Sequence, residues 1–246
     1  MHKFELPLNE RIRRLISLEN VFTRLNNQIN NMNAFSEFSC FQSYFHMHAV
    51  ASRADIKIEI VQELDKLITK KKLLSKTKKN LEQIKKLVTA KKNLDKLNVT
   101  QGNFFGNDKF LQEIKTASIS PSGIVSSDLP RLQLWIQSNS PKTKQNYFIK
   151  KIEPYIPIFN SLRTYLEIIR DTIKFESLSS LENGLVSYQL DPAAKHDLIQ
   201  IQTPQKLNLF PNLTSNKYTI NIQFNSANKA IKLKKPIKFK IGISHQ

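Results

Sequence analysis

The chain contains little glycine, little cysteine and few acidic residues. Its 246 residues include five Gly, one Cys, and 20 Asp and Glu against 38 Lys and Arg. The single Cys40 excludes an internal disulfide, which agrees with a reducing compartment such as the cytoplasm. The sequence lacks a Gly-rich phosphate loop, a Gly-x-Ser-x-Gly elbow and a Cys-x-x-Cys pair. These absences argue against an enzyme.

Long apolar runs are also missing. No stretch approaches the roughly 20 apolar residues that a membrane-spanning helix needs, so any membrane contact would be peripheral. The N-terminus carries charge at Lys3 and Glu5 and has no apolar core like that of a signal peptide. We therefore expect a cytoplasmic protein without a transmembrane segment.

Histidine and cysteine are too few and too poorly spaced for a convincing metal site. His46 and His48 lie two residues apart near Cys40, whereas two ligands on one helical face need a spacing of three or four residues. Nothing next to Cys40 in the sequence would lower its pKa, and such a cysteine usually packs as a small apolar residue. We expect no metal and no other cofactor.

The first two thirds of the chain read as helix. Apolar residues recur at threes and fours over residues 8–30, which predicts an amphipathic helix that begins just after Pro7. Residues 35–50 are dense in aromatics at helical spacing and are expected to fill a core. Further helices are predicted at residues 130–137, 143–152 and 155–175. Leu134 and Trp135 are expected to be core residues.

A lysine-rich segment at about residues 55–98 contains neither Gly nor Pro. One row of apolar residues within it repeats every seven positions, as in a narrow heptad seam flanked by lysine. An antiparallel helical hairpin that turns near residues 75–77 suits a compact protein better than one long rod. The members of this row are Ile60, Leu67, Leu74, Leu81 and Val88.

After residue 177 the pattern changes to short alternating runs. Residues 218–224 and 237–241 alternate apolar and polar side chains, which predicts half-buried strands. The expected fold class is therefore α+β, with an all-helical N-terminal domain at residues 1–176. An antiparallel β domain is expected to follow at residues 177–246.

Positive charge is concentrated in two places. Residues 66–96 contain twelve lysines against two acids, and eight lysines follow Asp197, the last acidic residue of the chain. Such lysines can simply form solvated faces, but their local excess favours an acidic partner, which could be nucleic acid, membrane or protein. Lysine attracts anions diffusely, and no nucleic-acid recognition motif accompanies it. Non-specific binding of nucleic acid by a basic helical protein stays open as an alternative function.

Several short stretches stand out along nearly the whole chain. Residues 4–11 read FELPLNER, and further stretches are ELD at 63–65, SDLP at 127–130 with Leu134 and Trp135 behind it, and LFP at 209–211 ahead of Lys217 and Phe224. In this order they resemble landmarks of the ZapD family of bacterial cell-division proteins, whose members open with Phe-Glu-x-Pro-Leu-Asn-Glu. Each stretch is short, but their order and spacing together make the resemblance fairly specific.

The resemblance implies a helical domain, a C-terminal β domain and a non-enzymatic homodimer. It also implies a basic surface that binds the C-terminal tail of FtsZ, the tubulin-like division protein. A dimer with two such sites would cross-link or bundle FtsZ filaments, which promotes Z-ring assembly and septum formation at mid-cell. Two lysine accumulations would suit an acidic, largely disordered tail that orders on binding.

By position, Arg53 and Lys217 match basic sites of the family. The same strand in family members resembles Lys-x-Arg-x-x-x-Arg-Phe, yet Thr219 and Gln223 stand here where arginines are expected. Either tail binding is weaker, or other lysines of the β domain supply the missing charge. The candidates for this role are Lys229, Lys232 and Lys234.

A structural role is the alternative for the two matched residues. Arg53 could cap a helix or neutralise a neighbouring acid, and Lys217 could be a solvated turn residue, because exposed charges usually matter little to a fold. The resemblance favours the binding role, more strongly for Arg53 than for Lys217.

Overall fold

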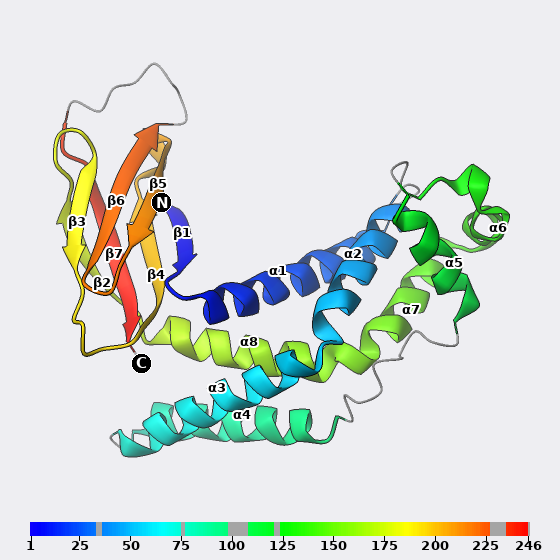
Figure 1. Ribbon diagram of the computed structural model, residues 1–246, viewed down its shortest axis with the longest axis horizontal. Coiled ribbons are helices and arrows are strands. Elements are labelled where there is room, and N and C mark those ends of the chain that lie inside the picture. The colour runs from blue at the N-terminus through cyan, green and yellow to red at the C-terminus, as the bar shows by residue number, and fades with distance from the viewer. Residues whose placement is uncertain (33–35, 75–76, 98–107, 121–123, 227–234, 246) are drawn as a thin grey trace. The chain divides into compact units, whose positions relative to one another are not determined.

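The computed structural model describes residues 1–32, 36–74, 77–97, 108–120, 124–226 and 235–245 (Figure 1). A short strand opens the chain at His2–Pro7, helices make up most of the described residues from Glu10 to Asp171, and antiparallel strands follow from residue 174 onward. The predicted α+β class is confirmed. The chain forms two compact units, a β unit of residues 1–16 and 166–246 and a helical unit of residues 17–165.

The helices agree with the apolar periodicity of the sequence, except that the helix predicted at residues 155–175 ends at Asp171 and residues 174–175 already belong to a strand. The α-helices are α1 (Glu10–Asn30), α2 (Glu37–Ala51), α3 (Ala54–Leu73), α4 (Lys78–Asp95), α5 (Lys109–Ser118), α6 (Pro130–Ser138), α7 (Pro141–Ile152) and α8 (Ile156–Asp171). Short 3-10 turns lie at η1 (Ser126–Asp128), η2 (Glu153–Tyr155) and η3 (Gln205–Leu207).

An aromatic cluster forms part of the core of the helical unit. The ring of Phe41 on α2 lies 4.8 Å from that of Phe148 and 5.6 Å from that of Trp135, measured between centroids. The expected core role is confirmed for Phe41, Tyr44, Phe45 and Met47, which are buried, and Trp135 packs against this cluster, whereas Phe35 lies outside the described residues. The expectation for Leu134 is wrong, because its side chain is 63% exposed while Leu132 is buried. Residues 132 and 135 share one helical face, whereas residue 134 points elsewhere.

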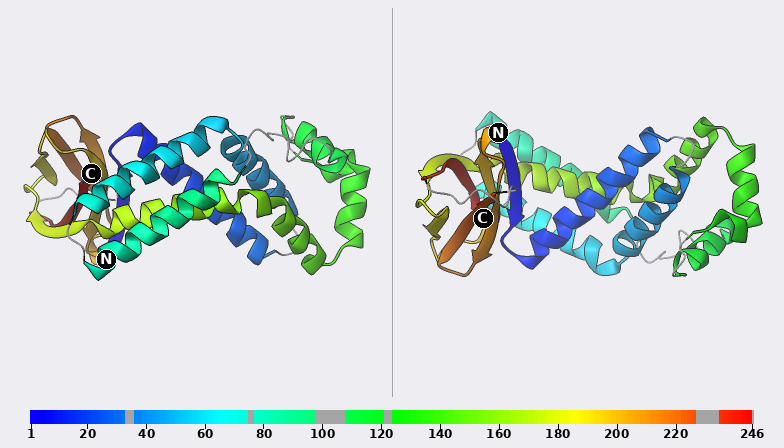
Figure 2. Two further views of the ribbon diagram at one scale, coloured as in Figure 1. Left: turned by 90° about the horizontal axis from the view of Figure 1, so that it is seen from below. Right: turned by 90° about the horizontal axis from the view of Figure 1, so that it is seen from above.

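The hairpin predicted at about residues 55–98 is present. Lys91 Nζ on α4 donates to Asp65 Oδ1 on α3 at 2.6 Å, and Lys57 Nζ on α3 donates to the Leu97 carbonyl at 2.5 Å. Early residues of α3 thus face late residues of α4, which makes the two helices antiparallel. Figures 1 and 2 show them next to one another. Residues 75 and 76 of the predicted turn lie outside the described residues.

The heptad row does not form a continuous seam. Ile60 and Leu67 are buried on α3, but Leu74 is 50% exposed and Leu81 is 46% exposed. The hairpin folds the row back on itself, so its later members no longer continue the face set by the earlier ones.

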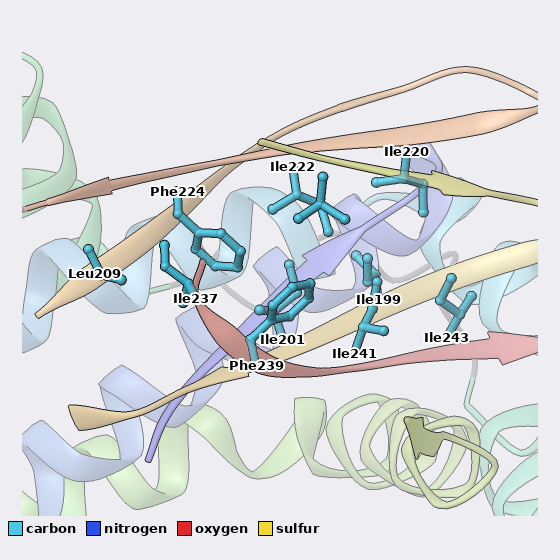
Figure 3. Packing of buried hydrophobic residues seen from close by; sticks show 11 residues of the cluster. Ile199, Ile201, Leu209, Ile220, Ile222, Phe224, Ile237, Phe239, Ile241 and Ile243 are labelled. Carbon is cyan, nitrogen blue, oxygen red and sulfur yellow. The ribbon is translucent and has the colours of Figure 1, made fainter. Parts of the chain in front are cut away.

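The β unit is built from two antiparallel sheets. Its strands are β1 (His2–Pro7), β2 (Lys174–Ser179), β3 (Leu185–Gln189), β4 (His196–Thr203), β5 (Leu209–Ser215), β6 (Thr219–Ser226) and β7 (Lys238–His245). One sheet has the order β1-β4-β7-β2 and the other β3-β6-β5. Their inner faces enclose an aliphatic core in which the rings of Phe224 and Phe239 meet across the sheets at 4.9 Å (Figure 3).

Strand β1 was not anticipated from the sequence. Its partner β4 lies almost 200 residues further along the chain, with Phe4 opposite Ile201. Asn9 then joins strand to helix: its Oδ1 accepts from the Ile12 amide at 2.9 Å, and its Nδ2 donates to Asp197 Oδ1 at 2.8 Å. The side chain therefore caps α1 and ties it to β4.

An ion pair anchors the end of α8 to the larger sheet. Arg170 Nη2 lies 2.6 Å from Glu5 Oε1, and Gln200 Nε2 donates to Glu5 Oε2 at 2.6 Å. Burial alone would raise the pKa of Glu5, but the hydrogen bonds and charge of Arg170, helped by Gln200, bring the pKa below its ordinary value of 4.5. Nearby, Gly242 packs closely against Ile173. A Cβ atom at residue 242 would clash with Ile173 Cγ2, so a larger residue would force Ile173 to move.

We expect Glu5→Gln to lower the free energy of unfolding by about 1–2 kcal/mol at pH 7, because Arg170 keeps its charge but loses its charged partner. A lowered folded-state pKa stabilises the fold fully above pH 4.5, and that contribution disappears as the pH falls through the folded-state pKa. The loss in the variant should therefore shrink at acidic pH. Urea denaturation between pH 3 and pH 7 measures it.

Glu10→Gln is the matched control. Glu10 pairs with Arg13 at 3.2 Å, but the two side chains are 75% and 63% exposed. Its effect should stay within about 0.5 kcal/mol at every pH. Equal effects of the two substitutions would contradict the role given to Glu5.

Candidate functional site

Arg53 lies at the N-terminal end of α3, where it forms an exposed ion pair. Its Nη2 is 2.8 Å from Asp55 Oδ2, and its Nε is 3.2 Å from Asp55 Oδ1. The hydrogen bond from Arg53 lowers the pKa of Asp55. The guanidinium thus already has a carboxylate partner, and an acidic ligand would have to compete with Asp55 for it.

Lys217 lies in the turn between β5 and β6. Asn216 organises this turn, because its Oδ1 accepts from the backbone amides of Tyr218 and Thr219, each at 2.8 Å. The Nζ of Lys217 lies 6.0 Å from the centroid of the Tyr218 ring, which is 60% exposed. An ammonium beside an exposed aromatic can meet both a carboxylate and an apolar side chain of a ligand.

Thr219 and Gln223, which replace the arginines expected from the family, lie on the outer face of the smaller sheet. Their neighbours Ile220, Ile222 and Phe224 point inward and are buried. Gln223 Nε2 donates to the carbonyl oxygens of Asn183 and Phe224. Strands β3, β5 and β6 contain no charged residue at all. Compensating charge therefore does not come from the strands of this sheet.

The three lysines that could supply the missing charge are not placed. Lys229, Lys232 and Lys234 lie outside the described residues. Arg53 belongs to the helical unit and Lys217 to the β unit.

A groove on the outer face of the larger sheet is lined by two lysines that were not chosen from the sequence as candidate binding residues. It has a volume of about 490 Å³ and is lined in part by Lys238, Lys240, Ser177 and Ser179. The register places Ser179 opposite Lys238 and Ser177 opposite Lys240. Each lysine therefore has a hydroxyl on the neighbouring strand. We call this surface the β7 groove.

A row of polar side chains extends the β7 groove across all four strands. Lys3 on β1 is opposite Gln202 on β4, which is opposite Lys240 on β7, which is opposite Ser177 on β2. Lys238 and Lys240 form no ion pair with any other described residue. Ammonium and hydroxyl donors on one face suit carboxylate or phosphate oxygens.

The signal for these lysines was present in the sequence. Residues 238–241 read KFKI, and this alternation directs Phe239 and Ile241 into the core and both lysines outward. What the sequence did not reveal is that the neighbouring strands bring Ser177 and Gln202 to the same face.

A second basic groove lies between α4 and α8 in the helical unit. It measures about 660 Å³, and its lining includes Lys85, Lys86, Lys96, Thr89 and Asn93. Carboxylates neutralise other lysines of the hairpin, since Lys66 pairs with Glu63 and Lys91 pairs with Asp65. The three lysines of the groove are exposed.

Cys40, His46 and His48, the candidates for metal or nucleophilic chemistry, are each buried or hydrogen-bonded. Cys40 is buried, and burial, with the nearby charge of Glu37, raises its thiol pKa to about 12. His46 Nδ1 lies 3.3 Å from Arg24 Nη2, and His48 bonds the hydroxyl of Tyr155. The described part of the chain holds no group of three or more metal-ligating side chains.

Within the described residues, no helix has both the length and the apolar character needed to cross a bilayer. Even α2, the helix with the buried aromatics, is only 15 residues long.

Comparison with known proteins places the chain in a family. A family model described as "ZapD: Cell division protein" matches residues 16–223. The chain belongs to the ZapD family. A Cell division protein ZapD of Chromobacterium violaceum is 29% identical over 238 residues, which cover 92% of this chain and 91% of the relative. A ZapD of Ralstonia pickettii is 26% identical over 230 residues, covering 90% of this chain and 89% of the relative.

The family membership confirms the resemblance carried by the short stretches. It supports a role in cell division for this chain, and the relatives' name indicates no catalytic activity. A ZapD of Nitrosomonas europaea is 26% identical over 229 residues, covering 90% of this chain and 85% of the relative. Similarity to each of these ZapD proteins thus extends over nearly all of both chains.

Proposed function

We propose that this chain binds the C-terminal tail of FtsZ in the cytoplasm and, as a homodimer, cross-links FtsZ filaments at mid-cell. This would promote Z-ring assembly and septum formation. The observation that carries the proposal is the match to the ZapD family over residues 16–223. No cofactor takes part.

The β7 groove is the described surface of the β unit best suited to an acidic tail. Lys238 and Lys240 offer ammonium groups, and Ser177 and Ser179 offer hydroxyl donors beside them. A disordered tail can lie along such a face and gain charge-assisted hydrogen bonds as it orders. Lys217 with Tyr218 provides a further cationic and aromatic contact in the same unit.

We retain three further lysines as candidates for tail binding, because they directly precede β7 in the sequence. They are Lys229, Lys232 and Lys234. Arg53 retains its proposed role through the family position, with Asp55 as its partner when no ligand is bound. Thr219 and Gln223 contribute no charge, so the cationic part of the site would be shifted from β6 towards β7 relative to the family pattern.

Bridging requires two tail sites in one particle. A homodimer supplies them, and because each filament displays many tails, weak individual contacts combine into strong cross-linking. Sedimentation equilibrium of the isolated chain would test for the dimer. A monomer over the micromolar range would remove the basis for bridging.

The double variant Lys238→Glu, Lys240→Glu is expected to weaken binding of a fluorescent FtsZ tail peptide by at least about 10-fold, because two attractive charges become repulsive. Fluorescence anisotropy at moderate salt measures the affinity. The matched control is Lys142→Glu, Lys150→Glu on α7, which changes the net charge equally at exposed positions. Equal loss in both double variants would mean that only overall charge matters.

Non-specific binding of nucleic acid is the second candidate, favoured by the twelve lysines at residues 66–96. Duplex DNA of arbitrary sequence would then bind with a salt slope set by phosphate counterion release. A peptide of scrambled FtsZ tail sequence separates the two functions. Selective binding of the native tail supports the first, whereas tight DNA binding without tail selectivity supports the second.

A further inference from the structure

The end of the α3–α4 hairpin reverses the usual distribution of polar and apolar side chains. We call residues 70–74 and 77–83 the hairpin tip. Its buried side chains are polar: Lys71 and Asn80 are 8% exposed, and Gln83 is 7% exposed. Its leucines face outward, with Leu73 84% exposed and Leu74 50% exposed. Buried polar and exposed apolar groups are the informative exceptions in a fold.

A hydrogen-bond network holds this reversed arrangement in place. Lys71 Nζ donates to Gln83 Oε1 at 2.5 Å, and Asn80 Nδ2 donates to the Lys71 carbonyl at 2.7 Å. The Thr77 hydroxyl caps α4 by accepting from the Asn80 amide at 3.2 Å. Polar side chains fill the space between the two helices at the tip, so the leucines find no apolar pocket between the helices. Leu73 and Leu74 are therefore left exposed on the helical unit, where a molecule that binds the tip would cover them.

Charge narrows the choice of that molecule. Residues 66–81 contain seven lysines and no acid, and Lys72, Lys78 and Lys79 are exposed around the leucines. A second copy of the tip would bring two sets of lysines together, which is repulsive. Nucleic acid would attract the lysines but would gain little from aliphatic leucines, since bases stack on aromatic rings and arginine, and the tip carries neither.

An anionic bilayer surface uses both features at once. Leucines enter the boundary between headgroups and acyl chains, while lysines extend their ammonium groups to the lipid phosphates. We propose that the hairpin tip is a peripheral membrane contact in which Leu73 and Leu74 insert into an anionic lipid surface and the surrounding lysines hold the headgroups. This contact lies in the helical unit and needs no protein partner, so it stands or falls independently of FtsZ binding.

Vesicle co-sedimentation of the isolated full chain tests the proposal. Vesicles with about one third phosphatidylglycerol in phosphatidylcholine should bind the chain, and pure phosphatidylcholine should bind it poorly. The variant Leu73→Ser, Leu74→Ser is expected to bind anionic vesicles about 10-fold more weakly, because it removes the apolar insertion and leaves every charge in place. Its affinity for duplex DNA should be unchanged.

Ile119→Ser is the matched control, because Ile119 is 77% exposed at the end of α5, away from the lysine-rich segment in sequence. It should bind vesicles like the unmodified chain. In a second measurement, Leu73→Trp should shift its fluorescence to the blue with anionic vesicles and be quenched by brominated lipids. Vesicle binding that survives loss of both leucines would mean charge attraction only and would overturn the proposal. No binding to anionic vesicles, or binding to DNA alone, would overturn it as well.

Discussion

Replacing Lys144 with methionine should lower the free energy of unfolding by about 3 kcal/mol, a large effect for a single substitution. Lys144 Nζ lies 2.6 Å from Glu37 Oε1, and the two side chains are only 8% and 2% exposed. Methionine keeps most of the aliphatic volume but leaves the Glu37 carboxylate buried without its ammonium. Urea denaturation followed by circular dichroism at 222 nm measures the loss.

Two further variants separate the ion pair from general effects on α7. Lys142→Met changes the same residue type on the same helix, but Lys142 is exposed, so the effect should stay within about 0.5 kcal/mol. The double variant Lys144→Met, Glu37→Leu should recover most of the stability, because replacing both partners of a buried pair is often nearly neutral. A double variant no more stable than Lys144→Met alone would argue against the unpaired carboxylate as the cause.

The sequence predicted those parts of the fold that depend on local pattern. Helical periodicity located α1, α2 and the hairpin, and alternation located β6 and β7. Strand β1 was not predicted because its pairing with β4 joins residues almost 200 positions apart. The strand itself has only six residues, one of them proline, and these show no strong alternating pattern. The same limit applied to Leu134, whose exposure depends on which helical face meets the aromatic cluster.

The β7 groove could not be predicted from the sequence, for a physical reason. The family pattern directed attention to the strand that contains Thr219 and Gln223, whose sheet turns out to be free of charge on all three strands. The lysines of the β7 groove lie on the other sheet. Ser177 and Ser179 lie beside these lysines because β2 is the neighbour of β7 in the sheet. The order of strands in a sheet cannot be read from any short stretch of sequence.

The two basic surfaces differ in chemistry as well as in position along the chain. The β7 groove combines lysines with hydroxyl donors and suits carboxylates. The hairpin tip combines lysines with exposed leucines and suits a lipid surface. Charge reversal in the groove and removal of the leucines at the tip therefore should affect different partners, which makes the two variants controls for one another.

The second large effect is expected when filaments of FtsZ lose their C-terminal tails. Co-sedimentation with polymerised FtsZ from the same organism should pellet most of the chain with intact filaments and almost none with tail-less filaments, because the tail supplies the acidic ligand and its repetition supplies avidity. Moderate salt should weaken both binding and bundling, since the contacts are between exposed charges.

This co-sedimentation is the most direct test of the central claim, that the chain is a division protein which acts by binding FtsZ tails. Comparison of intact and tail-less FtsZ at low and moderate salt provides the answer, with electron microscopy to detect bundles. Pelleting that requires the tail, together with bundles of intact filaments, is the predicted result. Pelleting with neither form while DNA of any sequence binds well would contradict the claim and favour the nucleic-acid function.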